Sequence, residues 1–409
     1  MEVLHPCCAG LDVHQKSVVA CVRRATSAGA QTETRTFLTS TRGLLALAAW
    51  LDEHGVTHAV MESTGVYWKP VWHVLDDGER ALTLANAREV KNLPGRKTDV
   101  NDAQWLAELL AHGLVRASFV APEPVQELRD LTRTRKQLIR ERAQHIQRVQ
   151  KTLENANLKL TGTLSDVMGK SGRAILSAII GGESDPEKLA ALAVGKARKK
   201  HAALVEVLHG RVRDHHRGML RLHLKMIDAL SATIGEVDEQ LGKALAPSKA
   251  QMKILMTMPG VSEVTAQVIL AEIGSDMSRF PTAGHLISWA GLCPRNDESA
   301  GKRRDRRIRK GSPWLRATLV QAAWAAAHSK GTYLRSLFVR LQRKGAKKAT
   351  IAVAASMLTA VWHMLRDGVE YADLGADHFA RRDEKKVVAR LARRLEQLGY
   401  EVEVKKKAA

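Results

Sequence analysis

Residues 8–22 read CAGLDVHQKSVVACV, and their pattern sets the architecture of the N-terminal part. Apolar residues alternate there around Val13, Val18, Val19 and Val22, as expected of β-strands with a buried face. An SAGA turn leads into TETRTFLTS, so we expect residues 8–40 to form strands. Asp12 lies inside the first run, where aspartate is disfavoured. This position calls for an explanation beyond strand formation.

Predicted helices and strands alternate in the residues that follow. A helix over residues 41–54 is predicted by its apolar stripe, followed by the short strand VTHAVMEST, which ends near Glu62. A helix at 66–76, a strand ALTLANA and a helix at 100–111 follow. Strand hairpin, helix, strand, helix, strand, helix is an α/β order. It fits an RNase H-like fold, in which catalytic carboxylates come from the first strand, a later strand and a late helix.

Four acidic residues stand at these places: Asp12, Glu62, Asp99 and Asp102. Asp99 and Asp102 are three residues apart and share a helix face if both are helical. Taken singly, Asp99 can be a helix-terminal residue, Asp102 a solvated first-turn acid and Glu62 a surface acid. Together the four carboxylates favour a metal site, where two Mg²⁺ ions can promote chemistry at phosphorus.

The composition points to a polyanionic partner. The 409 residues include 64 Lys and Arg against 43 Asp and Glu, a formal net charge of +21. Nucleic acid is the most plausible partner and a membrane surface the weaker alternative. We expect no membrane span, no secretory signal and no zinc site, because the four cysteines lack the spacing for one. A cytoplasmic location is the simplest interpretation.

A long helical region separates the two ends of the chain. APEP at 121–124 starts a stretch with apolar residues at mixed three-, four- and seven-residue spacing, which predicts a coiled-coil or helical-hairpin arm. A second helical stretch is expected over 186–245, with GKSGRAILSAIIGGES between the two as a connector. Its GKS is not a phosphate-binding loop, because the glycine that this motif needs five residues before Gly169 is absent. We expect domains at 1–120, 121–248, 249–370 and a basic helical tail at 371–409.

The C-terminal part is predicted to be mainly helical. MPGVSEVTAQVILAEIG, residues 258–274, has the character of a helix-hairpin-helix, whose turn can present backbone N–H groups to a phosphate. An ordinary αα-hairpin is the alternative. Between Lys302 and Lys310, seven of nine residues are basic, which favours a phosphate-contacting loop over a solvated face. The basic residues are Lys302, Arg303, Arg304, Arg306, Arg307, Arg309 and Lys310.

Two serines flank this basic run and either could act as a nucleophile. Ser299 lies in ESAGK at its start, and Ser312 lies in KGSPWLR at its end. Ser312 precedes Pro313 and has the pattern of a helix N-cap with proline at the first helical position. That structural account leaves Ser299 as the better nucleophile candidate.

These blocks resemble a known family. GLDVHQK, MESTGVYW and KTDVNDAQ are similar to the three acidic blocks of the DEDD-type insertion-sequence transposases, the IS-one-ten family. MPGVSEVTAQVILAEIG, SWAGLCP, ESAGKRR and KGSPWLRATLVQAAW resemble its C-terminal transposase domain. The similar blocks span roughly residues 8–115 and 250–365 and occur in the same order.

The resemblance implies a RuvC-like N-terminal domain whose metal-binding acids map onto Asp12, Glu62, Asp99 and Asp102. It also implies a catalytic serine, which we map onto Ser299 with Ser312 as the fallback. Such proteins are Mg²⁺-dependent, prokaryotic DNA recombinases guided by a structured bridge RNA, and they act as dimers that pair into a tetramer across donor and target DNA. A nucleoid-associated location follows from that activity.

The resulting hypothesis is strand cleavage and exchange through a covalent phosphoserine, which conserves the phosphodiester energy without ATP. With 4% aromatic residues, base stacking is not expected to dominate nucleic-acid binding. Two alternatives remain. One is a hydrolytic RuvC-like nuclease such as a junction resolvase, in which the acids activate water. The other is a non-catalytic nucleic-acid-binding protein whose acids are structural.

Overall fold

The computed structural model describes residues 2–27, 29–63, 65–86, 99–294, 298–299, 302–303 and 308–404, with backbone only at 99–101, 298–299, 302–303 and 386–387. The chain forms two compact units, Met1–Val120 and Ala121–Ala409. Each unit is described by itself.

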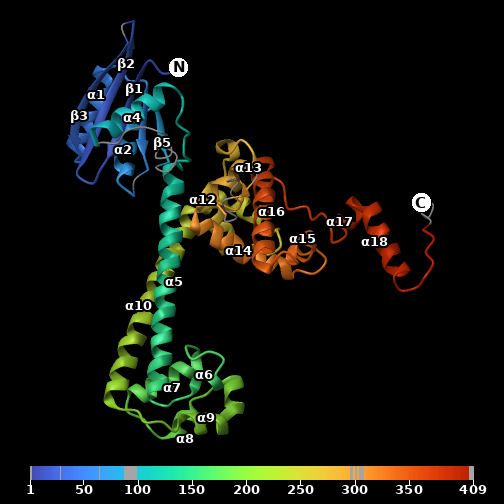
Figure 1. Cartoon of the computed structure of the whole chain (residues 1–409). Coiled ribbons are helices and arrows are strands. Elements are labelled where there is room, and N and C mark those ends of the chain that lie inside the picture. Colours follow the sequence, from blue (N-terminus) through green and yellow to red (C-terminus); the bar gives the residue numbers. More distant parts are fainter. Residues whose placement is uncertain are drawn as a thin grey trace. The chain divides into compact units, whose positions relative to one another are not determined.

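A five-stranded mixed sheet organises the first unit (Figure 1). Its strands are β1 (Cys7–Val13), β2 (Ser17–Thr26), β3 (Gly29–Leu38), β4 (His58–Glu62) and β5 (Ala81–Ala85). The spatial order is β3-β2-β1-β4-β5, with β1, β2 and β3 antiparallel and β1, β4 and β5 parallel. The predicted α/β order of this part is confirmed.

Helices cover both faces of this sheet. Odd-numbered residues of β1 such as Leu11 pack with α1 (Thr41–Glu53) and α2 (Trp68–Leu75) in one core. Even-numbered Cys8 packs with Val60 and with α4 (Asp99–Ala111) on the other face. This division follows from the two-residue side-chain period of a strand. It decides which side of the sheet each acidic residue faces.

Two long helices form the first part of the second unit (Figure 1). They are α5 (Glu123–Asn155) and α10 (Asp214–Ala244). Arg135 pairs with Asp238, and His145 lies against His223, so rising numbers in α5 meet falling numbers in α10. The two helices are therefore antiparallel.

Short helices lie between α5 and α10 in the sequence, and they share one apolar cluster with both. They are α6 (Leu160–Thr163), α7 (Lys170–Ile180), α8 (Pro186–Ala191), η1 (Gly195–Lys200) and α9 (His201–Leu208). The expectation of a connector at 169–184 is wrong, because α7 buries Ile175, Leu176 and Ile179 in that cluster. The second helical stretch is also interrupted between α9 and α10.

The remainder of the second unit is helical around one short hairpin. It contains η2 (Ala246–Ser248), α11 (Lys249–Met256), α12 (Glu263–Ile273), η3 (Met277–Arg279), α13 (Ala283–Trp289), β6 (Glu298–Ser299), β7 (Lys302–Arg303), α14 (Pro313–His328), α15 (Tyr333–Gln342), α16 (Ala346–Asp367), α17 (His378–Arg382) and α18 (Glu384–Glu396).

The turn between α11 and α12 is packed rather than open. Gly260 has φ of +83°, and a Cβ there would lie 2.3 Å from the carbonyl oxygen of Ala322 in α14. Only glycine fits both the conformation and the contact. The two helices and the turn between them are present. Because α14 covers the glycine of this turn, the arrangement is compatible with an ordinary αα-hairpin.

Among the described residues, α16 is the one helix with the length and apolar content to cross a bilayer. Its buried stripe includes Val353, Met357 and Val361. The helix packs against α13, α14 and α15. A core helix of a water-soluble fold meets the same test of length and composition.

Candidate active site

Asp12 and Glu62 stand at the carboxyl ends of two neighbouring parallel strands. β1 and β4 pair with Leu11 opposite Met61, so the next residue along each strand is one of the two acids. Residues at equal register in a parallel pair point to the same face of the sheet. Two residues before Glu62, Val60 is buried against α4. Both carboxylates therefore lie on the face that α4 covers.

α4 runs along β1 in the opposite direction. Cys8 Sγ donates a hydrogen bond to the Ala107 carbonyl oxygen at 3.4 Å. A Cβ on Gly10 would lie 2.1 Å from the Ala103 carbonyl oxygen. Two strand residues thus match four helix residues, as their rises of about 3.3 and 1.5 Å per residue require. Two residues further along β1 and four residues back along α4, the same spacing places Asp99, where α4 begins, at the level of Asp12.

Asp102 belongs to the same end of α4. It stands one turn before Leu106, whose Cβ would be 2.9 Å from a Cβ on Gly10. Asp102 is half-buried and makes no hydrogen bond or ion pair with a described side chain. The backbone therefore assembles all four predicted acids at one end of β1, β4 and α4.

His14 is a neighbour of Asp12 that sequence reasoning missed. Its Nε2 lies 3.0 Å from Asp12 Oδ2, and the Asp12 side chain is only 15% exposed. Strand periodicity was the available signal, because residues two apart share a face. The imidazole can donate to the carboxylate, with the tautomer setting its role.

The donor chemistry of this set suits a divalent cation. Carboxylate oxygens are the ligands that Mg²⁺ and Mn²⁺ prefer. Among the side chains that the structure describes, no group of three or more His, Cys, Asp or Glu residues converges tightly enough to hold a metal ion. The Asp99 side chain lies outside the described residues. The set fits a metal by residue type, strand register and helix position.

An ion pair between a buried arginine and a partly exposed glutamate holds α4 on the sheet. Arg23 of β2 is 6% exposed and donates to Glu108 of α4 from Nε at 2.6 Å and from Nη2 at 3.4 Å. His112 Nε2 lies 3.0 Å from the same carboxylate. The Arg23 hydrogen bond, with a smaller contribution from His112, lowers the pKa of Glu108. This contact fixes the helix that carries Asp99 and Asp102.

Ser299 lies in a β-hairpin of the second unit. Glu298–Ser299 pairs antiparallel with Lys302–Arg303, and Ser299 is opposite Lys302. A further bridge joins Pro294 to Ile308. The backbone of Ser299 therefore lies at the end of its strand that is nearer the tip of this hairpin. The side chains of Ser299, Lys302 and Arg303 are outside the description, as are residues Arg304, Arg306 and Arg307 entirely.

Two glycines close the base of this hairpin. A Cβ on Gly311 would lie 2.3 Å from the Ala290 carbonyl carbon, and one on Gly291 would lie 2.7 Å from the Arg309 carbonyl oxygen. Gly291 also has φ of +68°. Any side chain at either position would push the two arms apart. Arg309 and Lys310, next to this base, are exposed.

Ser312 has a structural role. As predicted, it caps α14: its Oγ accepts from the Leu315 N–H at 3.3 Å, and Pro313 begins the helix. The same hydroxyl donates to Glu272 Oε2 at 2.9 Å. A hydroxyl that both accepts and donates in this way is committed to the fold.

Glu272 of α12 is a fully buried acid that sequence reasoning missed. Arg133 of α5 holds it with two hydrogen bonds, from Nε at 2.9 Å and from Nη2 at 3.0 Å. Arg129 donates to its backbone oxygen. Burial lowers the pKa of the Arg129 guanidinium to about 10, and the Glu272 carboxylate opposes that effect. Glu272 therefore joins α5 and α12 to the start of α14.

Cations surround Trp314 on α14 beside this cluster. The guanidinium carbons of Arg133 and Arg140 lie 5.7 Å from the ring centroid, and Lys136 Nζ lies 5.9 Å from it. Burial, with a smaller contribution from Arg140, lowers the pKa of Lys136. Cations held over an aromatic face gain about 0.5–2 kcal/mol each, which offsets part of their mutual repulsion.

Two transposase family models match the chain in order. One, for the DEDD transposases of IS110 elements, matches residues 9–157, and the other, for the transposases of the IS116/IS110/IS902 family, matches residues 252–339. The acidic set falls in the first and the Ser299 hairpin in the second. The chain belongs to this family of transposases. The recognition made from the sequence blocks is confirmed.

The relatives of the transposase include uncharacterized proteins of insertion elements and a gene-inverting protein. A 42 kDa protein of insertion element IS900 from Mycobacterium paratuberculosis is 26% identical over 71% of this chain and 80% of its own length. A pilin gene-inverting protein of Moraxella bovis is 22% identical over 81% of this chain and 88% of its own. A 43.6 kDa protein of element IS110 from Streptomyces coelicolor is 29% identical over 36% of this chain, a match that spans 38% of that relative.

Proposed function

We propose that this transposase cleaves and rejoins DNA strands, with the acids of the first unit as metal ligands and Ser299 of the second unit as the nucleophile. The observation that carries the proposal is the register of β1 and β4, which puts Asp12 and Glu62 side by side on the face of α4. A sheet with this strand order is that of an RNase H-like or RuvC-like domain, which we propose for residues 1–120.

Asp12, Glu62, Asp99 and Asp102 would bind divalent metal, and we propose Mg²⁺. The metal would supply Lewis-acid stabilisation of negative charge on oxygens at phosphorus. The chain's own part is to hold the carboxylates in place. The Arg23–Glu108 pair fixes α4, and Gly10 lets the helix approach β1 closely enough to bring its first turn beside Asp12.

Ser299 is the proposed nucleophile. Its Oγ forms a bond to phosphorus while the bond from phosphorus to the deoxyribose oxygen breaks, the serine proton passes to a base, and the leaving oxygen gains a proton. The occupied hydroxyl of Ser312 supports this choice, because Ser312 cannot attack without giving up its bond to the buried Glu272. The reverse step on a second strand joins donor to target.

Phosphate contacts are proposed around the base of the hairpin. Arg309 and Lys310 are exposed there, and the cations around Trp314 add positive charge near the start of α14. The proposal also includes Lys302, Arg303, Arg304, Arg306 and Arg307. Basic side chains in this number give binding that weakens steeply with salt.

We further propose a structured bridge RNA as the source of sequence specificity and dimers that pair into a tetramer. The α5–α10 arm within 121–248, the transposase domain at 249–370 and the tail at 371–409 would be the separate parts of that assembly. Crosslinking in cells carrying the element, followed by RNA sequencing, tests the guide. Sequence-specific action of the protein without any bound RNA would contradict the proposed guide.

Trapping a covalent protein–DNA adduct tests the chemistry. Wild type with element-end DNA, guide RNA and Mg²⁺ should give an adduct that Ser299→Ala abolishes and Asp12→Asn reduces by at least about 100-fold. Ser312→Ala should retain adduct formation. Free ends without adduct would show a hydrolytic nuclease instead. Loss in Ser312→Ala with retention in Ser299→Ala would reverse the nucleophile assignment, and no cleavage by any protein would favour a non-catalytic binding role.

A further inference from the structure

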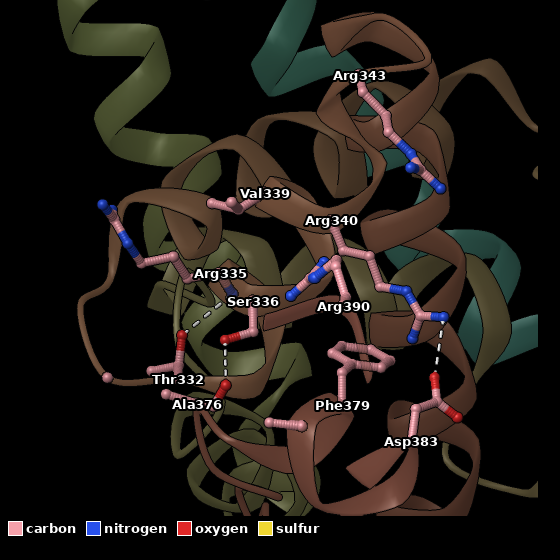
Figure 2. Close-up of a pocket in the computed structure, with 12 residues that line it drawn as sticks. Thr332, Arg335, Ser336, Val339, Arg340, Arg343, Ala376, Phe379, Asp383 and Arg390 are labelled. Carbon is pink, nitrogen blue, oxygen red and sulfur yellow. Dashed lines mark hydrogen bonds and ion pairs between the residues drawn. The ribbon is translucent and has the colours of Figure 1, made fainter. Parts of the chain in front are cut away.

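An arginine-lined cleft lies between α15 and the tail helices, outside the sites above (Figure 2). Its volume is about 770 Å³. Four arginines are among the residues that line it, while Asp383 is the one acid in its lining. The arginines are Arg335, Arg340, Arg343 and Arg390. The second family match ends at residue 339, so most of this cleft lies beyond the matched residues.

Two of these arginines have no partner in the part of the chain that the structure describes. Arg340 pairs with Asp383 at 3.3 Å, and Arg335 Nη1 donates to a carbonyl oxygen of α14 at 3.5 Å. Arg343 and Arg390 make no hydrogen bond or ion pair with a described residue. The cleft thus carries three positive charges in excess, at a cost in repulsion that a bound anion would remove.

The floor of the cleft is apolar and aromatic. Phe379 stacks on Tyr333 with ring centroids 5.3 Å apart, and the Arg340 guanidinium lies 4.6 Å from the Phe379 ring. Figure 2 shows the Arg340 guanidinium above the Phe379 ring and directed to Asp383. Planar guanidinium groups held in this way favour bidentate recognition of phosphate oxygens.

The tail is tied down where it reaches the cleft. The Tyr371 N–H donates to Thr257 Oγ1 at 2.9 Å, and the Tyr333 N–H donates to Asp373 Oδ1 at 3.0 Å. The Ser336 hydroxyl donates to the Ala376 carbonyl oxygen at 2.7 Å. Because these bonds join the segment before α17 to α11 and α15, the cleft is part of the folded unit.

We propose that this cleft binds the phosphate backbone of a single-stranded nucleic-acid segment. Its arginines match a chain of phosphates, and its apolar floor accepts the face of a base or sugar. Its volume is in the range of small-molecule clefts, so we expect it to take part of a flexible single strand and not a duplex. The choice of nucleic acid among polyanions rests on the proposed function. The site is a binding site separate from the acids and from Ser299.

Binding of labelled 20-nucleotide oligomers to the full chain tests the site, with Asp12→Asn present to prevent cleavage. Arg343→Gln with Arg390→Gln removes the two unpartnered arginines. Arg393→Gln with Arg394→Gln is the matched control, because both lie exposed on α18 outside the cleft and remove the same charge. The probes are single-stranded DNA, single-stranded RNA of equal sequence, and duplex DNA.

We expect the cleft variant to bind single strands at least about tenfold more weakly at low salt and to lower the salt slope by about 1.4, since each single-strand phosphate contact contributes about 0.7. The control should lose less than about threefold. Arg343→Lys with Arg390→Lys should restore the salt slope, because lysine keeps the charge, but only part of the affinity, because lysine lacks the planar fork of arginine. The tighter of the two single-stranded probes identifies DNA or RNA as the natural occupant.

Equal losses in the cleft variant and the control would overturn the proposal, as would equal losses for duplex and single strands. Polyglutamate is then added as a competitor. If it releases the oligomer from wild type but not from the cleft variant, the cleft binds an acidic protein segment instead. The adduct assay with Ser299 is independent. An absent adduct beside a cleft-specific binding loss would refute the recombinase chemistry and leave this site standing.

Discussion

Replacing Glu272 with glutamine removes the charge on which Arg133 and Ser312 converge. The carboxylate is fully buried and the Arg133 side chain is 33% exposed. Breaking a buried pair by neutralising one partner costs about 3–5 kcal/mol, and partial solvation of Arg133 puts our expectation near 3 kcal/mol. The amide keeps the shape, so the loss comes from charge and hydrogen bonding rather than from a cavity.

Hydrogen exchange measures this effect locally, which suits a chain of two units whose global unfolding need not be two-state. Amides of α12 and the start of α14 that exchange through opening of this cluster should exchange about 100-fold faster in Glu272→Gln, because 1.4 kcal/mol corresponds to a factor of ten. Glu263→Gln is the control: it lies exposed in the first turn of the same helix. Its expected cost is below about 1 kcal/mol.

A change of less than about threefold in those amides, or one matched by Glu263→Gln, would refute the reasoning. It would show that Glu272 is dispensable for fixing the start of α14. Unchanged exchange in the first unit serves as an internal reference, because the substitution lies in the second.

Three further predictions concern the first unit and the hairpin. Glu108 has a lowered pKa in the folded state, so its stabilisation is present above the ordinary value of 4.5 and is lost as pH falls through the lower folded pKa. Thermal melts from pH 3 to 7 should show Glu108→Gln less stable than wild type at pH 7 by no more than about 1 kcal/mol, because solvent screens the partly exposed carboxylate, and the gap should close toward pH 3. A gap that stays constant with pH would contradict the pairing. Burial raises the pKa of the Cys8 thiol to about 11. Maleimide at neutral pH should therefore label half-buried Cys293 but not Cys8 in the native protein, as judged by peptide mass spectrometry. Native labelling of Cys8 would disprove its burial. Gly311→Ala should reduce adduct formation at least about tenfold by opening the base of the hairpin. Gly284→Ala is the control and should not reduce it, because the nearest atom to a Cβ there is 3.4 Å away. Equal activity of the two variants would show that the base of the hairpin accommodates a methyl group.

Much of the site could be predicted from local pattern. Aspartate in a β-rich run, glutamate at a strand end and two acids three residues apart indicate carboxylates at the edge of one sheet. The cap at Ser312 was equally readable, because the Ser-Pro order at a helix start is a local rule. The helix α7 was missed, because a short helix that follows Gly169 and ends at Gly181-Gly182 resembles a loop in sequence.

Periodicity and turn residues depend on neighbours along the chain, so the sequence alone places most of the elements, names the four acids and reveals the basic run after Ser299. Long-range contacts decide the rest. Gly10 is essential because α4, nearly a hundred residues later, crosses it, and Glu272 matters because Arg133 and Ser312 meet it from two other helices. Neither contact leaves a mark within a window of sequence, because the chain must first fold before these residues become neighbours.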